Sequence, residues 1–358
     1  MFDPAVIQQL ANKHKRPLQE MAQIERELNE RFVEFGDPVL ALILAVISGE
    51  PLLLVGPPGT AKSRLIRAFS GMLGLLNEDH PERDHPEYFE YLLTPFTEPG
   101  ELFGFFDIAQ LLDPQSRKLT RDDKGMMQHA TVVYLDEVFN ASSAILNSLL
   151  AFLNERVFHD RGKRIKVANL KALFAATNDV PRTPELRAVF DRFVLRCWVD
   201  NVEPNASRIS HLVKAGWKET YGIKEIAVAN QQTSSTTTYR RNELLNDLES
   251  MREDIRRLTA ANRLTPQTTH EIYDNLARYV KTARENGLSE MSNRRLIKIS
   301  YIMLMHRVYF LANQERPPSK ELSIGAQELQ LIQLYFFDSF DPKDDTLRNN
   351  LRREARPR

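Results

Sequence analysis

The stretch Leu52–Ser63, LLLVGPPGTAKS, decides how the first half of the chain folds. Its first four residues form an uninterrupted apolar run, which is typical of a strand buried in a parallel sheet. The remainder, Gly56–Ser63, matches the phosphate-binding pattern G-x-x-x-x-G-K-[ST], except that Ala61 replaces the second glycine. The helix-like segment RLIRAFSGMLGLL follows, so the loop lies between a strand and a helix, as this pattern requires.

The loop predicts a site for a nucleoside triphosphate. Its glycines let backbone amides curl around phosphate oxygens, and the following helix contributes the positive end of its dipole. Lys62 is predicted to reach the β- and γ-phosphates, and the Ser63 hydroxyl to join the shell of a Mg²⁺ ion. Because Gly59 is retained and Ala61 keeps its backbone amide, the alanine indicates a subclass of the loop rather than a loss of binding.

Two further strand-like runs end in polar side chains. The run TVVYLDE ends in Asp136, which is predicted to hold Mg²⁺ directly or through water, and in Glu137, which is placed to polarise the attacking water. Asn178 ends the run KALFAATN and is placed to hydrogen-bond the γ-phosphate and that water. Because ligands of parallel α/β sheets bind at the carboxyl ends of strands, we expect these groups in one crevice. The predicted nucleotide-binding residues are Gly56, Pro57, Pro58, Gly59, Thr60, Ala61, Lys62, Ser63 and Asp136.

The segment PELRAVFDRFVLR offers two arginines, Arg187 and Arg192, shortly before the last strand-like run. An arginine in this place could enter the site of a neighbouring subunit and neutralise charge that develops on the phosphates. The alternative is an ordinary surface salt bridge.

The chain divides into an α/β half and a helical half. Strand-like and helix-like runs alternate up to about Asp200, which predicts a parallel sheet covered on both faces. From Glu203 onward the patterns are helical, apart from the polar tract Gln231–Thr238, which predicts a linker or mobile loop. The predicted domains are an N-terminal helical segment (1–36), a nucleotide-binding domain (37–202), a helical domain (203–340) and a basic tail (341–358).

Taken together, the motifs GPPGTAKS, VVYLDE, FAATN, ELRAVFDRF and SNRR resemble those of AAA+ ATPases. More narrowly, the chain resembles the MoxR family and its RavA-like branch. Alanine before the loop lysine is typical of that branch, as are LDEVFNASSAILNSLLAFLNERVF and LTPFTEPGELFGFFDI. The resemblance implies a five-stranded P-loop AAA+ core followed by an all-α lid, ATP and Mg²⁺ as cofactors, and a hexameric ring.

The same resemblance assigns roles to single residues. Lys62 and Ser63 match the first Walker motif, Asp136 and Glu137 match the second, and Asn178 matches sensor 1.

Two arginines complete the implied catalytic set. Arg192 matches the arginine finger that acts on a neighbouring subunit, with Arg187 as the alternative. Arg294 matches sensor 2 on the lid, with the adjacent Arg295 as the alternative. The predicted catalytic residues are Glu137, Asn178, Arg192 and Arg294.

The resemblance also implies two insertions and a biological role. Pro99–Gly125 corresponds to a helix-2 insert, and Arg156–Asn169 to a hairpin before sensor 1. The predicted function is an ATP-hydrolysing chaperone that remodels or assembles protein complexes, with a protein substrate and a VWA-domain protein as partner. The alternative is an AAA+ nucleic-acid motor or helicase loader, supported by basic residues at the hairpin tip. These residues are Arg161, Lys163, Arg164 and Lys166.

The composition argues against binding to nucleic acid and against association with a membrane. The 48 basic residues balance the 48 acidic ones, so no overall field attracts nucleic acid or an anionic membrane surface. The single cysteine, Cys197, excludes an intrachain disulfide and fits a reducing compartment. The N-terminus lacks a signal pattern and no apolar run is long enough to span a bilayer, so we expect a cytoplasmic protein.

Overall fold

The computed structural model describes most of the chain. The described residues are 1–76, 87–112, 115, 119–160, 163–181, 183–221, 231–267, 272–314 and 323–338. The predicted basic tail (341–358) and residues 77–86 lie outside these residues.

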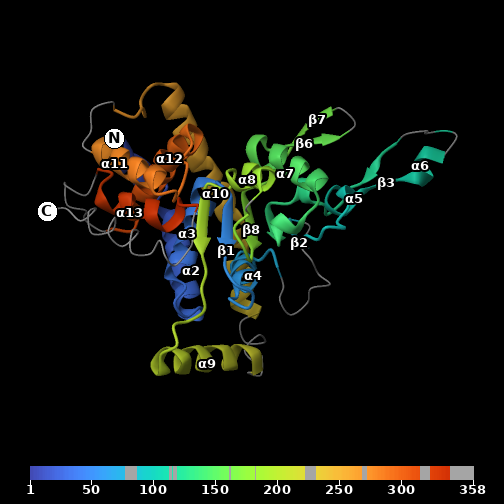
Figure 1. Ribbon diagram of the computed structural model, residues 1–358, viewed down its shortest axis with the longest axis horizontal. Coiled ribbons are helices and arrows are strands. Elements are labelled where there is room, and N and C mark those ends of the chain that lie inside the picture. The colour runs from blue at the N-terminus through green and yellow to red at the C-terminus, as the bar shows by residue number, and fades with distance from the viewer. Residues whose placement is uncertain are drawn as a thin grey trace.

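A five-stranded parallel sheet with the order β2–β5–β8–β1–β9 lies at the centre of the α/β half (Figure 1). Its strands are β1 (Leu52–Val55), β2 (Tyr88–Leu92), β5 (Val132–Asp136), β8 (Ala172–Thr177) and β9 (Leu195–Trp198). The strands predicted from the runs LLLV, TVVYLDE and KALFAATN are confirmed as β1, β5 and β8. The strands β5, β8 and β1 are direct neighbours in the sheet. They end in the paired carboxylates, in Asn178 and in the phosphate-binding loop, respectively.

Alternate residues of each strand point to opposite faces of the sheet and into separate hydrophobic clusters. In β1, Leu52 and Leu54 join the cluster on the side of α3 (Gly36–Ser48) and α4 (Lys62–Met72), whereas Leu53 and Val55 join the cluster on the side of α7 (Ser143–Glu155). All four side chains are fully buried, which explains why the strand is apolar at every position. The covering helices are α3 (Gly36–Ser48), α4 (Lys62–Met72), α7 (Ser143–Glu155) and α8 (Pro184–Phe190).

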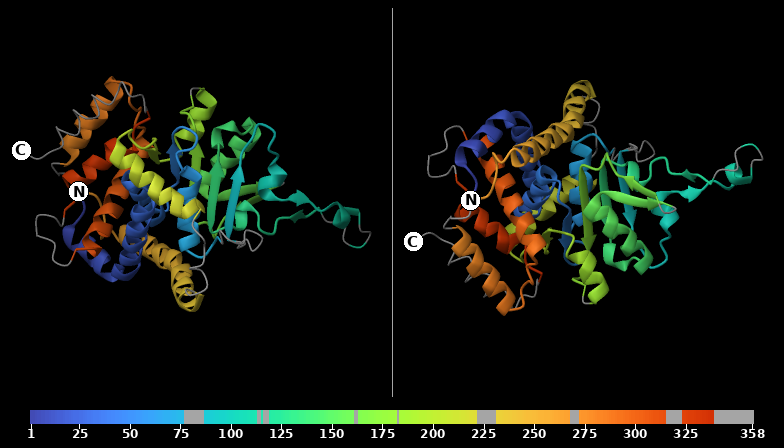
Figure 2. Two further views of the ribbon diagram at one scale, coloured as in Figure 1. Left: turned by 90° about the horizontal axis from the view of Figure 1, so that it is seen from below. Right: turned by 90° about the horizontal axis from the view of Figure 1, so that it is seen from above.

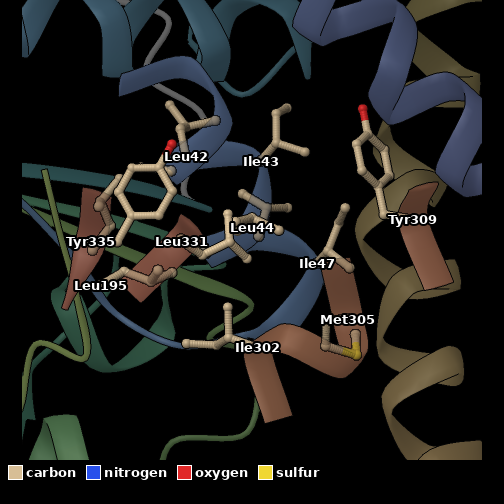
Figure 3. Packing of buried hydrophobic residues seen from close by; sticks show 14 of the residues in the cluster. Leu42, Ile43, Leu44, Ile47, Leu195, Ile302, Met305, Tyr309, Leu331 and Tyr335 are labelled. Atoms are coloured by element: carbon tan, nitrogen blue, oxygen red, sulfur yellow. The ribbon is translucent and has the colours of Figure 1, made fainter. Parts of the chain in front are cut away.

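The helical half combines the two ends of the chain (Figure 2). Its helices are α1 (Pro4–Lys13), α2 (Lys15–Arg31), α9 (Ala206–Tyr221), α10 (Gln231–Ala260), α11 (Ile272–Glu285), α12 (Asn293–Ala312) and α13 (Ala326–Tyr335). The first helix packs along α12, and α2 lies against α3 and α10. Figure 3 shows how α3, β9, α12 and α13 share one core, in which Ile47, Ile302 and Leu195 are fully buried. The N-terminal segment is therefore packed into the helical half.

The prediction of a linker at Gln231–Thr238 was wrong, because these residues form the first turns of α10. Serine, threonine and glutamine lower helix stability by only a few tenths of a kcal/mol each, and the tract holds neither glycine nor proline. The adjoining segment RRNELLNDLESMREDIRRL is rich in strong helix formers, and a helix extends more easily than it starts.

Both predicted insertions form separate elements that project from the sheet (Figure 1). The first contains α5 (Pro99–Phe103), β3 (Phe105–Phe106), α6 (Ile108–Leu112) and β4 (Arg121–Asp122). The second is an antiparallel hairpin of β6 (Val157–Asp160) and β7 (Lys163–Lys166). The Arg121 guanidinium joins the two, since its Nε lies 2.9 Å from Asp160 Oδ1.

The basic residues of the hairpin are exposed in β7. Arg164 pairs with Glu155 at 2.9 Å, and Arg161 lies outside the described residues. None of the described helices is both long and apolar enough to cross a membrane.

Candidate nucleotide-binding site

The loop Gly56–Ser63 leaves β1 at its carboxyl end and enters α4. Gly56 lies against β9, where a Cβ atom would stand 1.9 Å from the carbonyl oxygen of Val199, so only glycine fits. The Thr60 hydroxyl donates to the Pro57 carbonyl oxygen at 2.8 Å and closes the turn. The loop is therefore held by its own backbone and by the neighbouring strand.

Ala61 adopts the left-handed conformation, with φ 61° and ψ 22°, immediately before α4. A glycine at position 61 would adopt this conformation without strain, whereas it costs any other residue about 1–2 kcal/mol. Its methyl group packs at the edge of the hydrophobic core, which offsets part of that cost. The alanine therefore preserves the backbone path of the loop.

Replacing Ala61 with glycine is expected to stabilise the fold by up to about 1 kcal/mol, because relief of strain outweighs the added freedom of the unfolded chain. Urea unfolding of both forms measures this change. ATP affinity is expected to differ by less than about threefold, because the backbone amide is the same in both residues. A large loss of stability would show that the methyl contact, rather than backbone strain, dominates at this position.

Lys62 is the first residue of α4 and is almost fully buried in the loop. Its Nζ donates to the carbonyl oxygens of Gly56 at 2.6 Å and Pro57 at 3.0 Å, and to Asn178 Oδ1 at 3.1 Å. Burial lowers the pKa of Lys62, while the carboxylates of Glu137 and Asp136 act in the opposite direction. The amine therefore lies where the ends of β1, β5 and β8 converge.

Ser63 and Asp136 place two oxygen atoms side by side. The Ser63 hydroxyl donates to Asp136 Oδ2 at 2.9 Å. It also accepts a hydrogen bond from the hydroxyl of Tyr134 at 3.0 Å. Tyr134 was not predicted as part of the site, although strand alternation places it on the same face of β5 as Asp136. Burial, followed by the charge of Asp136, raises the pKa of Tyr134, so the phenol remains a donor.

Glu137 leaves the strand in a left-handed conformation, with φ 51°. Its amide donates to Asp136 Oδ1 at 3.0 Å, and Asn140 Nδ2 donates to its Oε2 at 3.3 Å. Burial is the main cause that raises the pKa of Glu137, and the neighbouring Asp136 adds to it. A carboxylate with a raised pKa is a stronger proton acceptor. Asn140 is a second contact that was not predicted from the sequence.

The donor set fits a nucleoside triphosphate with Mg²⁺. Magnesium prefers carboxylate, hydroxyl and phosphate oxygens, and it commonly takes only one or two ligands from the protein. Asp136 and Ser63 supply such oxygens beside the Lys62 amine. Within the described part of the chain, no group of three or more His, Cys, Asp and Glu side chains is arranged as a metal cage. The geometry suits a metal shared with phosphates.

The arginines lie in a second group. Arg192 follows α8 and is half-buried, with Nη1 3.6 Å from Asp191 Oδ2, and its Nε has no hydrogen-bond partner among the described residues. Burial lowers the pKa of Arg192, and the charge of Arg294 lowers it further. The alternative finger, Arg187, is exposed on α8.

Arg294 and Arg295 are adjacent in sequence but differ in environment. Arg294 is exposed, whereas Arg295 is 1% exposed and bonded to Ser289, Asp338 and the Phe336 carbonyl oxygen. Arg295 is thus held in the protein interior, which leaves Arg294 as the residue able to meet a ligand.

The strand order, the loop between β1 and α4 and the carboxylates at the end of β5 define a P-loop ATPase core of the AAA+ class, followed by an all-α lid. A family model described as "MoxR domain in the MoxR-vWA-beta-propeller ternary systems" matches residues 19–238. The chain belongs to the MoxR family of AAA+ ATPases.

The chain is also similar to curated proteins. The chain is 34% identical over 213 residues to an uncharacterized protein of Methanocaldococcus jannaschii, a match that covers 58% of this chain and 52% of that protein. It is 30% identical over 232 residues to a structural protein of Acidianus two-tailed virus, covering 63% of this chain and 34% of that protein. The chain thus spans about a third to a half of these relatives.

The fold also matches the crystal structure of "a putative ATPase" from Cytophaga hutchinsonii. The TM-score is 0.56 at 13% identity, and the match covers 96% of each chain. This similarity extends the shared fold over the lid as well as the core.

Proposed function

We propose that the chain hydrolyses ATP in a homo-oligomeric, hexameric ring and uses the energy to remodel or assemble protein complexes. One observation carries this proposal: the Lys62 amine, the Ser63–Asp136 pair and Asn178 converge at the ends of three neighbouring strands. In this arrangement the loop amides and Lys62 bind the triphosphate, and Asp136 and Ser63 hold Mg²⁺. A bound Mg²⁺ ion would neutralise part of the negative charge of the phosphates.

Glu137 is proposed to position the attacking water and accept its proton, and Asn178 to orient the water and the γ-phosphate. The raised pKa of Glu137 suits proton acceptance, and Asn140 supports its carboxylate. Asn178 is within hydrogen-bond distance of Lys62 Nζ, so it lies beside the position proposed for the γ-phosphate.

The ring is proposed because the arginines form a group of their own. None of the described hydrogen bonds of Lys62 and Ser63 involves Arg192 or Arg294, and the charge of Arg294 lowers the pKa of Arg192. We propose that this arginine pair completes the nucleotide site of the neighbouring subunit, with Arg192 as the finger and Arg294 as sensor 2.

A vWA-domain protein is the proposed partner, because the matching family is described from MoxR–vWA–β-propeller systems. The protein substrate, the cytoplasmic location and the narrower place in the RavA-like branch stay predictions from the sequence.

The test is the ATPase rate measured against protein concentration. Because each site requires residues from two subunits, the rate per subunit is expected to rise with concentration and to reach a plateau as rings form. Sedimentation on the same samples gives the fraction assembled. Mg²⁺ removal by EDTA is expected to abolish turnover. A constant, substantial rate per subunit from monomer to assembly would overturn the two-subunit site.

A further inference from the structure

Asp338 connects two segments that are far apart in sequence. It follows α13 and accepts hydrogen bonds at Oδ1 from Arg196 of β9 and, at 2.6 Å, from Arg295 of α12. At Oδ2 it accepts the Ser289 hydroxyl at 2.7 Å and the amide of Glu290 at 3.3 Å. One carboxylate therefore holds the last strand of the sheet and the start of α12 together.

Arg196 fixes the turn that carries Arg192. It is fully buried, its Nε donates to the Phe193 carbonyl oxygen at 2.9 Å, and its Nη2 donates to the Phe190 carbonyl oxygen at 2.9 Å. The guanidinium also lies 3.8 Å above the centre of the Phe190 ring. The backbone on both sides of Arg192 is thus bonded to a side chain that is itself bonded to Asp338.

Arg295 fixes the first turn of α12 in the same way. Its Nη2 donates to the Phe336 carbonyl oxygen at 2.6 Å, and its Nη1 donates to the Ser289 hydroxyl at 3.0 Å. Arg294, the preceding residue, is exposed. The position of Arg294 therefore depends on the contacts of Arg295.

The charges of this cluster require the carboxylate. Both buried guanidiniums form ion pairs with Asp338, the charge of Asp191 also favours each of them, and burial lowers the pKa of Arg295 to about 10. Without the negative charge of Asp338, Arg196 and Arg295 would repel each other in a water-poor environment, and such unpaired buried charges are strongly unfavourable. The two segments would then move apart, and Arg192 and Arg294 with them.

We propose that Asp338 is a positioning residue that holds Arg192 and Arg294 as one unit, so that both guanidiniums reach the nucleotide of the neighbouring subunit together. This role rests on the proposed function of the two arginines in that site. Asp338 itself touches neither the nucleotide-binding loop nor the carboxylates of β5 in its described contacts.

The test is Asp338→Asn, which keeps the shape of the side chain and removes its charge. Because displaced catalytic groups cost about ten- to a hundredfold in rate, kcat is expected to fall by that factor, with the ATP dissociation constant within about twofold of wild type. Mixing with Lys62→Ala subunits is expected to restore turnover, because Lys62→Ala subunits supply correctly placed arginines to the intact loop of Asp338→Asn. A loss of overall folding would not be restored in this way.

A second variant and a control complete the experiment. Arg295→Met removes the bond between α12 and Asp338 but leaves Arg196 paired with Asp338, so the buried charges stay balanced. This variant is expected to lose turnover as Asp338→Asn does, and mixing with Lys62→Ala subunits is expected to restore it. The control Asp254→Asn removes a carboxylate bonded to Lys13 at 2.5 Å and His14 at 2.8 Å in another part of the helical half, and wild-type kcat is expected.

The outcomes separate the positioning role from the proposed function. The first case is that mixing with Lys62→Ala restores the turnover of Arg192→Ala, so that the two-subunit site stands. The positioning role is then refuted if Asp338→Asn and Arg295→Met keep wild-type kcat. It is also refuted if these two variants lose turnover that mixing does not restore. If Asp338→Asn fails to assemble, Arg295→Met decides by the same criterion. If Arg192→Ala is not restored, the two-subunit site fails, and the role of Asp338 fails with it.

Discussion

Replacing Glu137 with glutamine is expected to slow ATP turnover by assembled subunits about 10²- to 10⁴-fold and to leave ATP binding intact. The amide has the same shape as the carboxylate, but it cannot accept the proton of the attacking water. Lys62, Ser63 and Asp136 keep their contacts in this variant, so the triphosphate is still bound. Phosphate release and equilibrium ATP binding, measured on the same preparation, separate the two effects.

The pH profile gives an independent check on Glu137. Burial raises its pKa, so the fraction of ionised carboxylate falls at a higher pH than for an exposed glutamate. Wild-type turnover is therefore expected to decline as the pH drops through this raised pKa, and the residual activity of Glu137→Gln is expected to lack that acidic limb. The matched control is Glu155→Gln, an exposed residue at the end of α7, for which wild-type rates are expected. Rapid turnover by Glu137→Gln would remove Glu137 from the proposed mechanism.

The main parts of the fold and the site were predictable because they depend on local patterns. Leu52–Val55 is apolar at every position, and the runs that end in Asp136 and Asn178 are mostly apolar, since both faces of the sheet are covered. Parallel strands end at the same edge, so the polar residues that follow them had to converge near Lys62.

Contacts between distant segments were not predictable in this way. The contact of Arg196 with Asp338 was not predicted, because the two residues lie 142 positions apart and no local pattern marks the pair. Likewise, Gln231–Thr238 has the composition of a linker, and its helix extends from the strong helix formers that follow. Asn140 follows the acidic pair in a short turn, whose geometry alone brings it to Glu137.

The second large effect concerns the arginine that is proposed to act between subunits. Arg192→Ala is expected to lower turnover on the order of 10³-fold, because a finger neutralises charge that develops only in the transition state. ATP affinity is expected to change little, since the described contacts of the loop do not involve Arg192. The measurement is kcat together with the ATP dissociation constant. Arg187→Ala, on the exposed side of α8, serves as the matched arginine variant.

Mixing identifies the subunit on which Arg192 acts. Lys62→Ala alone is expected to abolish ATP binding and turnover, because the amine that meets the triphosphate is lost. In a random equal mixture with Arg192→Ala, about one interface in four combines an intact loop with an intact finger, and turnover is expected to recover toward that share. Two inactive variants can produce activity together only if each site is built from two subunits. If the mixture stays inactive while Arg187→Ala is recovered by Lys62→Ala, the finger is Arg187, and the pairing of Arg192 with Arg294 serves the structure of one subunit alone.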